Sequence, residues 1–361
     1  MNVTVKKSKR IFYLDALRAL AIIAVILIHI FDGCTFQYVS NDYGSFNWFF
    51  AVFINNGFRI GVDLFLMLSG ALSLGRNWDI KEFLSRRIPR IVKPFVFWGL
   101  ILSVLLIVVS FVFHLQYLPD YSLISIIEFI GNAYLSKSIG FIPYWFFWMI
   151  LGTYLIMPIF DKWVSFSNLK DIEYFLVLWL ITCIFSFTLN QDFVIKLTYF
   201  TSPIGLVVLG YYLRNTERKL LNNPYVNILM IIMPLICLMI LTYLLSDNTG
   251  FYMFNRYNIF LAIEVSGIFL LFKNAGKLKI DFSFLSRGIL YKIIMAFATY
   301  SYGLYLVHRP LTVLIMEVLP FEILHYKLYV LLLLIIDVVF SFAILYVLNK
   351  IPIVKDWIGV K

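Results

Sequence analysis

The sequence predicts an all-α protein, a polytopic transmembrane bundle of about ten helices that forms a single domain over residues 1–361. Hydrophobic residues make up 62% of the chain and charged residues only 14%, whereas soluble domains have roughly 45–50% and about 25%. Apolar runs long enough to cross a bilayer recur along the whole chain, and Lys and Arg collect in alternate gaps between them. No gap is long enough for a separate folded unit, which needs about 50 residues or more.

The spans follow from the length that a bilayer demands, about 20 apolar residues with a range of about 17–25. We predict spans at 12–31, 50–75, 94–114, 143–160, 173–189, 197–213, 225–245, 257–272, 293–316 and 327–349. The second run contains Arg59 and Asp63, so its outer part, from Phe46 to Phe58, is expected to be broken or interfacial. In the gap at 115–142, SLISIIEFIGNAYL has apolar residues at helical spacing, which predicts an interfacial helix.

Orientation follows from the distribution of positive charge, because cytoplasmic loops retain Lys and Arg. One set of gaps and tails holds 23 of the 30 Lys and Arg residues, and the opposite set holds only Lys137, Lys196 and Arg256. Both termini are therefore predicted to be cytoplasmic. The net charge of +10 is explained by topology, so no nucleic-acid partner is expected. Frequent Ile, Phe, Asn and Lys suggest a bacterial origin, and we expect the bacterial plasma membrane.

The first span carries three ionisable residues, which are costly inside a membrane and are therefore candidates for function. Asp15 and Arg18 are three residues apart and can pair on one helix face. Arg18 and His29 are eleven residues apart, close to three turns, which places them on one stripe about 16 Å apart along the axis. An equally weighted alternative is that Asp15 and Arg18 only neutralise each other and that His29 is an interfacial residue.

Five sequence motifs in order resemble acyltransferase family 3, the integral membrane O-acyltransferases, in its short ten-span branch without a fused soluble domain. They are YLDALRALAIIAVILIHI at 13–30, GVDLFLMLSGALSL at 61–74, SRRIPRIVKPF at 85–95, YWFFWMILGTYLIMPIF at 144–160 and SYGLYLVHRPL at 301–311. Many family members carry a glutamate in the Trp-rich helix that 144–160 resembles, and this stretch has no acidic residue. An acceptor-site glutamate therefore cannot be transferred to this chain.

The resemblance implies transfer of an acyl group, acetyl or succinyl, from acyl-CoA to a hydroxyl of a cell-surface polysaccharide or lipid-linked glycan, without a metal. His29 matches the essential histidine of the family and Arg18 its paired arginine, with Asp15 as the partner of Arg18. Chemistry agrees with this assignment, because histidine titrates near neutral pH and can remove the proton of a sugar hydroxyl as general base. A cation near the stripe could stabilise the oxyanion that forms.

The basic element after the second span offers a site for the phosphates of coenzyme A, because guanidinium groups bind phosphate with paired hydrogen bonds. Arg87 and Arg90 match the RxxR pattern of the family and are the predicted cofactor-binding residues. For Arg86, Lys81 and Lys93 the favoured explanation is the positive-inside rule.

The ninth span places Ser301, Tyr305 and His308 at i, i+4 and i+7, on one helix face. They are candidates for binding acceptor or acyl group, and a structural histidine before Arg309-Pro310 is an equally weighted alternative for His308. Ser69 lacks the strand–turn–helix setting of a hydrolase nucleophile, so helix packing by Ser69 and Gly70 is expected instead.

Aromatic residues of the fourth span are a second set of substrate candidates. Trp145 is the one we assign to substrate binding, by stacking on a sugar or on adenine. For the whole group of Tyr144, Trp145, Trp148 and Tyr154, an interfacial aromatic belt is the favoured explanation. Asp63, Glu264 and Asp337 remain possible intramembrane partners of Arg18 or Arg59.

Two other classes of function compete with the enzyme. An exporter or flippase of a polysaccharide or lipid-linked sugar would move glycan without making an acyl product, but the two halves of the chain show no repeat of the kind common in transporters. A membrane scaffold or sensor would tolerate changes at both Arg18 and His29.

Overall fold

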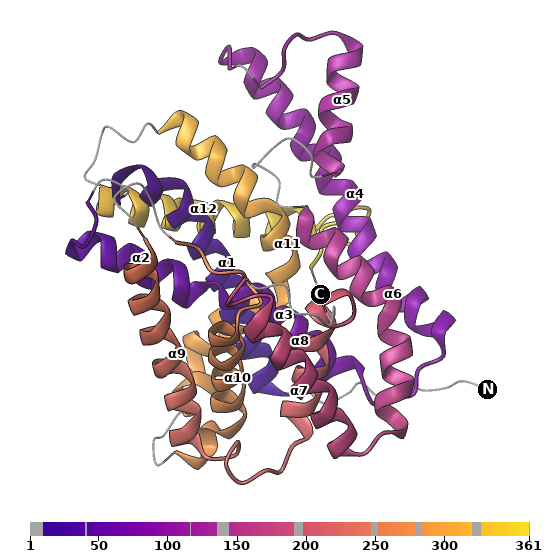
Figure 1. The fold of residues 1–361 in the computed structure, drawn as a ribbon. Helices are drawn as coiled ribbons and strands as arrows, with labels where there is room; N and C mark the ends of the chain where they lie inside the picture. The colour runs from indigo at the N-terminus through magenta and orange to yellow at the C-terminus, as the bar shows by residue number, and fades with distance from the viewer. Residues whose placement is uncertain are drawn as a thin grey trace.

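The described part of the chain folds into α-helices with two short 3₁₀ turns (Figure 1). The computed structural model describes residues 10–39, 42–115, 117–135, 144–190, 198–246, 252–278, 283–319 and 326–360. Lys137 and Lys196, which the charge count used, lie outside these residues. The all-α prediction is confirmed.

Eight segments of the described chain are long and apolar enough to cross a membrane. They are formed by α1 (Phe12–Val39), α2 with α3 (Phe46–Phe58 and Ile60–Ser73), α4 (Ile80–Val112), α6 (Trp145–Phe166), α9 (Pro224–Leu245), α10 (Ile259–Asn274), α11 (Gly288–Val318) and α12 (Tyr326–Asn349). The chain is a multi-pass membrane protein.

The other two predicted spans, 173–189 and 197–213, correspond to α7 (Leu169–Phe185) and α8 (Thr198–Asn215). These helices have 17 and 18 residues and do not belong to the eight segments. They pack on each other, and α8 also packs on α3. The count of ten spans and the cytoplasmic termini stay predictions.

Two local expectations are confirmed. The second span is interrupted at Arg59, where α2 ends and α3 begins, and the Arg59 Nη1 donates to the backbone oxygen of Phe254 at 2.7 Å. A helix within 115–142 is present as α5 (Leu123–Tyr134), which begins after its N-cap Ser122, and its interfacial position stays a prediction. In Figure 1 α5 and the adjoining end of α4 project beyond the other helices, and α5 exposes apolar side chains such as Leu123 and Ile124.

Helix α1 lies at the centre of the bundle, in contact with α2, α3, α10, α11 and α12. Small side chains allow this close packing, since Ala21 and Ala24 are fully buried and Gly61 of α3 lies against Ala21 and Val25. The polar residues of α1 therefore face other helices rather than lipid.

The α3–α8 contact depends on two glycines. A Cβ atom at Gly70 would collide with the backbone of Val207, and one at Gly210 would collide with the backbone of Met67. The expectation that Gly70 serves helix packing is confirmed. This contact holds α3 in place as one wall of the cavity described below.

Candidate functional site

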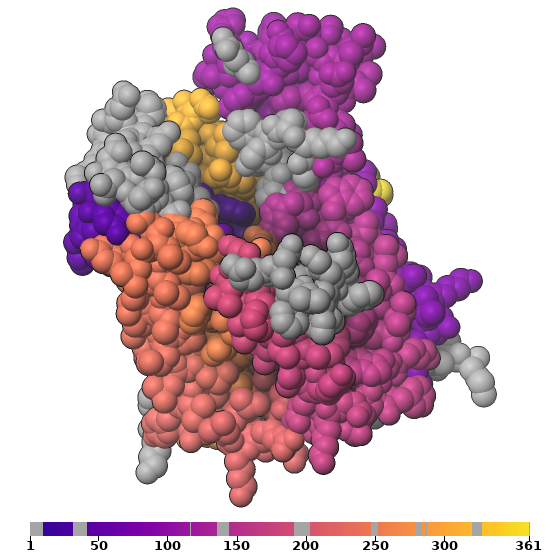
Figure 2. Space-filling model, viewed as in Figure 1, coloured from indigo at the N-terminus to yellow at the C-terminus, as the bar shows by residue number. Residues whose placement is uncertain are grey.

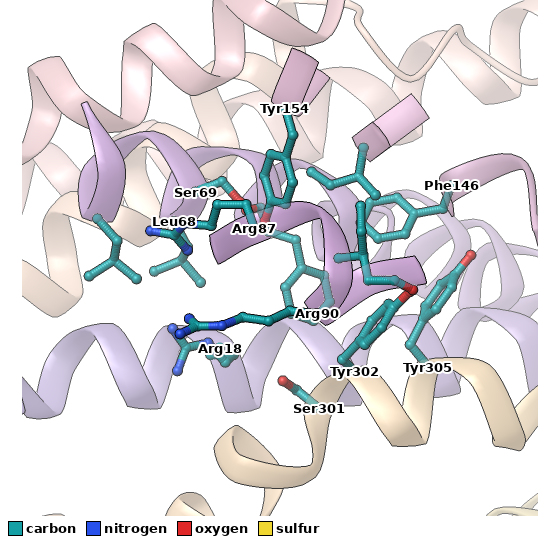
Figure 3. Close-up of a pocket in the computed structure, with 14 residues that line it drawn as sticks. Arg18, Leu68, Ser69, Arg87, Arg90, Phe146, Tyr154, Ser301, Tyr302 and Tyr305 are labelled. Carbon is teal, nitrogen blue, oxygen red and sulfur yellow. The ribbon is translucent and has the colours of Figure 1, made fainter. Parts of the chain in front are cut away.

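A cavity with about 740 Å³ of empty space, including the part that opens to solvent, lies among α1, α3, α4, α6 and α11. Its polar and cationic lining residues are Arg18, Ser69, Arg87, Arg90, Tyr154, Ser301, Tyr302 and Tyr305, and its apolar ones are Phe65, Leu68, Leu72, Ile91, Phe146 and Ile150. Figure 3 shows the guanidinium nitrogens toward one side and the rings of Phe146, Tyr302 and Tyr305 toward the other. The cavity thus has an arginine end and an aromatic end.

The arginine end consists of Arg18, Arg87 and Arg90. Arg18 Nη1 forms an ion pair with Asp15 Oδ1 at 3.0 Å, as the spacing predicted, and Arg87 Nη2 donates to Ser73 Oγ at 2.7 Å. The positive charges of Arg90 and Arg18 lie close enough to repel that of Arg87. Among the described residues Asp15 is the one acid within ion-pair distance of the three. An excess of like charge around a cavity favours an anionic ligand.

The start of α4 is fixed by a buried carboxylate. Asp161, which is fully buried, accepts the backbone N–H groups of Arg76 at 3.0 Å and Trp78 at 2.6 Å, and Asp79 caps α4 by accepting from the N–H of Glu82. A carboxylate that accepts two backbone N–H groups holds a loop rigidly. The helix that carries the RxxR pattern therefore begins at a defined position.

Neighbouring cations of α4 point elsewhere. Arg86 pairs with Glu82 at 2.7 Å, and both side chains are about half exposed. Lys93 Nζ lies 5.5 Å from the ring centre of Trp357. Neither of them, nor Lys81, lines the cavity, whereas Arg87 and Arg90 do.

The aromatic end is lined by rings in contact. The ring centres of Phe146 and Tyr305 are 4.9 Å apart, and Tyr302 donates to the backbone oxygen of Ile91 at 2.9 Å. Ser301 also lines the cavity, with its hydroxyl bonded to the oxygen of Ala298 at 3.1 Å. Ser301 and Tyr305 thus share the cavity wall, in agreement with their predicted common helix face.

His29 and His308 form a pair beside this end. Nδ1 of His29 and Nε2 of His308 are 2.8 Å apart, and the two rings are stacked with centres 5.1 Å apart. The ring centre of Tyr305, which lines the cavity, is 6.1 Å from that of His308. Neither histidine lines the cavity. His308 is fully buried because it lies further along α11, where that helix packs on α1, so it meets His29 rather than open space.

The hydrogen bonds of the pair define which nitrogen of His29 is available. Nδ1 of His308 lies 2.8 Å from the carbonyl oxygen of Leu304, which can only accept, so this nitrogen carries a proton. In neutral His308, Nε2 then accepts from Nδ1–H of His29. The lone pair of His29 is therefore on Nε2, and His29 is partly exposed. Such fixing of a tautomer by a second group is typical of catalytic histidines.

Arg256, a cation for which the sequence indicates only a place in the topology, lies near the histidine pair. The Arg256 guanidinium carbon is 3.9 Å from the ring centre of Trp145, and its charge acts on both His29 and Tyr305. Trp145, the predicted stacking residue, is 37% exposed. Figure 2 shows a hollow in one face, with atoms in the indigo of the N-terminal helices at its floor between gold atoms of α11 and magenta atoms of α6. Few cations lie on the predicted outer side, and this scarcity could have identified Arg256 as a candidate functional residue.

Two other expectations about side chains are settled by the structure. The belt interpretation is wrong for Tyr144, which is fully buried, and for Tyr154, which lines the cavity. Both rings contact α4 rather than lipid, Tyr144 at Phe95 and Tyr154 at Phe83. Arg18 pairs with Asp15, so Asp63 is not its partner. The buried Asp63 is acted on by the charges of Arg59 and Arg256 instead.

This is a multi-pass membrane protein with a cavity lined by three arginines, beside a pair of hydrogen-bonded histidines. Within the described part of the chain, no group of three or more His, Cys, Asp or Glu side chains could hold a metal ion. A family model described as an acyltransferase domain, that of acyltransferase family 3, matches residues 11–347. The chain belongs to this family and is a membrane acyltransferase. No curated protein and no solved structure matches it.

Proposed function

We propose that the protein transfers an acyl group from acyl-CoA to a hydroxyl of a cell-surface polysaccharide or lipid-linked glycan, in the bacterial plasma membrane, with His29 as general base. The observation that carries this proposal is the position of three arginines around one cavity whose opposite end adjoins the histidine pair. Membership of an acyltransferase family agrees with it.

In this proposal the arginine end binds the donor. Arg87 and Arg90 hold phosphate oxygens of coenzyme A, and Arg18, kept in place by Asp15, adds a third cation. The distance along α1 between Arg18 and His29 is about 16 Å. The flexible pantetheine arm spans this gap and brings the thioester to the aromatic end.

The proton transfer follows from the tautomer of His29. Nε2 of His29 takes the proton of the acceptor hydroxyl while its oxygen attacks the thioester carbonyl, and a bond forms between that oxygen and the acyl carbon. The carbon–sulfur bond then breaks, and the leaving thiolate takes the proton from His29. His308 accepts from Nδ1–H throughout and keeps the ring oriented, while the charge of Arg256 favours the transient oxyanion.

The test is mass analysis of exported glycans from wild-type cells, a deletion strain and a strain with His29→Ala. The proposal expects one ester-sized mass to disappear in both mutants while the glycan yield holds, and this mass identifies the acyl group. A matched strain with Arg86→Gln, which changes an exposed cation outside the cavity, should keep the ester.

The exporter predicts a different pattern. Glycan export would fall in the deletion strain with unchanged ester content per glycan, and His29→Ala would behave as wild type. That result would refute the transferase, provided that immunoblots show equal amounts of protein in the membrane.

A further inference from the structure

A second cavity, here called the basic cavity, lies where α8 and α10 end and α9 begins. It has about 1070 Å³ of empty space, including the part that opens to solvent. All of its lining residues are polar or charged, and none of them lines the cavity with the three arginines. They are Arg214, Asn215, Thr216, Glu217, Lys219, Asn222, Lys273 and Lys277. A cavity with such a lining suits a polar ligand.

Positive charge exceeds negative charge around the basic cavity. Glu217 is the one acid in its lining, against four cations, which are Arg214, Lys219, Lys273 and Lys277. Within the described residues none of the four cations forms an ion pair. The charges of Lys277 and Glu217 lie close enough to act on that of Lys273. A concave surface with an excess of like charge attracts an anion.

Hydrogen bonds to the backbone hold two of the lysines in place without neutralising them. Lys273 Nζ donates to the backbone oxygens of Leu213 at 2.8 Å and Thr216 at 3.0 Å. Lys277 Nζ donates to the backbone oxygen of Asn222 at 3.1 Å. Each ammonium group has three N–H donors, so both keep donors for a ligand. Their partners are uncharged, and the positive charge therefore stays uncompensated.

The basic cavity lies at a face of the membrane, beside an apolar surface. Helices α9 and α10 are two of the eight segments that can cross a membrane, and the cavity lies at the end that they share. The predicted topology places this end on the cytoplasmic side. About one and a half turns into α9, a row of exposed apolar side chains begins on one helix face. They are Leu229, Ile232, Met233, Ile236 and Ile240.

We propose that the basic cavity binds the headgroup phosphate of an anionic phospholipid, whose chains lie along the exposed face of α9. Basic pockets between transmembrane helices on the cytoplasmic side bind anionic lipid headgroups. The apolar face of α9 favours a lipid over a soluble phosphate, because it offers the chains a surface beside the cations. The inference goes beyond the proposed function and depends on neither the acyl donor nor the acceptor.

The lipid would act on the packing of α8. Arg214 Nη1 donates to the backbone oxygen of Ala71 in α3, and α8 packs on α3. A ligand that binds only the folded protein stabilises it. Phosphatidylglycerol should therefore raise the Tm of the protein in detergent, and it should do so less in Lys219→Gln/Lys277→Gln. An equal rise in both proteins would contradict the assignment.

Binding is measured by native mass spectrometry of the purified full chain. The protein is titrated with phosphatidylglycerol and, separately, with phosphatidylcholine, whose headgroup carries no net charge. Wild type should bind phosphatidylglycerol at least about tenfold more tightly. Lys219→Gln/Lys277→Gln should weaken its binding by about 10- to 30-fold and leave that of phosphatidylcholine unchanged. Lys219→Arg/Lys277→Arg, which keeps both charges, should bind both lipids as wild type does.

The matched control is Lys81→Gln/Lys170→Gln, which removes two exposed cations that line neither cavity. Its binding of phosphatidylglycerol should equal that of wild type. Equal losses in the two glutamine variants would show attraction by total charge and overturn the site, as would equal binding of the two lipids by wild type. Displacement of phosphatidylglycerol by excess glycerol 3-phosphate would show that the cavity takes a soluble phosphate and would overturn the lipid assignment.

Discussion

Arg18 and His29 belong to the same helix, yet the two regions that they help to form are built in opposite ways. The arginine end gathers like charges around open space, with Asp15 as the ion-pair partner that the described residues provide. The histidine pair is closed by hydrogen bonds of 2.8 Å on both nitrogens of His308 and on Nδ1 of His29. The first arrangement is completed by a ligand. In the histidine pair, every ring nitrogen except Nε2 of His29 already has a hydrogen-bond partner within the protein.

This difference predicts a division of labour. Substitutions at the arginine end should weaken donor binding, because they remove charge that a ligand neutralises. Substitutions at the histidine pair should slow transfer without affecting donor binding. A change that affected both quantities equally would break the comparison.

The largest expected effect is that of His29→Gln. Glutamine keeps a hydrogen-bonding group near His308 but removes the base, so kcat should fall by about 10²–10⁴. Binding of coenzyme A in nanodiscs should stay within about twofold of wild type, since His29 does not line the cavity. A residual kcat near that of wild type would remove His29 from the mechanism.

Arg90→Gln should weaken binding of coenzyme A by about 10- to 100-fold, because a charge-assisted hydrogen bond contributes about 1.5–3 kcal/mol. The rate at saturating donor should change little. S-Acetylpantetheine, which lacks the phosphates, provides the control substrate, and its kcat/KM should be the same in wild type and Arg90→Gln. Arg86→Gln is the control variant and should bind coenzyme A normally. Equal losses in Arg86→Gln and Arg90→Gln would point to general surface charge instead of a phosphate site.

His308→Phe should lower kcat by about tenfold, because His29 then loses the acceptor that fixes its tautomer and is left with an unpaired donor. His308→Gln, which restores an acceptor, should recover part of the rate. Since His308 acts through His29, affinity for coenzyme A should be unchanged in both variants. If the two variants lose the same activity and also lose thermal stability, the role of His308 is structural only.

Arg256→Gln should have the smallest effect and lower kcat by about two- to fivefold. This factor corresponds to the free energy of a cation–π contact together with that of a partly solvated charge. Donor binding should not change. The measurement is the same nanodisc assay, with Trp148→Phe as the control for loss of an exposed aromatic residue of α6. If Arg256→Gln changed donor binding, Arg256 would act at the arginine end of the cavity instead.

The sequence was informative where a property resides within one helix. The spacing of Asp15 and Arg18 predicted their ion pair, and the interruption of the second span at Arg59 followed from polar residues inside an apolar run. Periodicity also placed Ser301 and Tyr305 on one face, and both line the cavity. Each of these depends on local helix geometry, which sequence spacing encodes.

Contacts between distant helices could not be predicted in this way. His29 and His308 are separated by 279 residues, and nothing in either segment specifies that α1 and α11 bring them together. For the same reason Arg256 was assigned only a topological role, and Tyr154 was assigned to an interfacial belt. Hydropathy alone also could not show that α7 and α8 pack on each other or that α8 packs on α3.

The most direct test of the two-ended site is a cryo-EM structure of the protein in nanodiscs with S-ethyl-coenzyme A. The account predicts density for the diphosphate among Arg18, Arg87 and Arg90, with the ethyl group at Phe146 and Tyr305, on the cavity side of the histidine pair. Density for the nucleotide outside this cavity, or in the reverse orientation with the phosphates at the aromatic end, would contradict it.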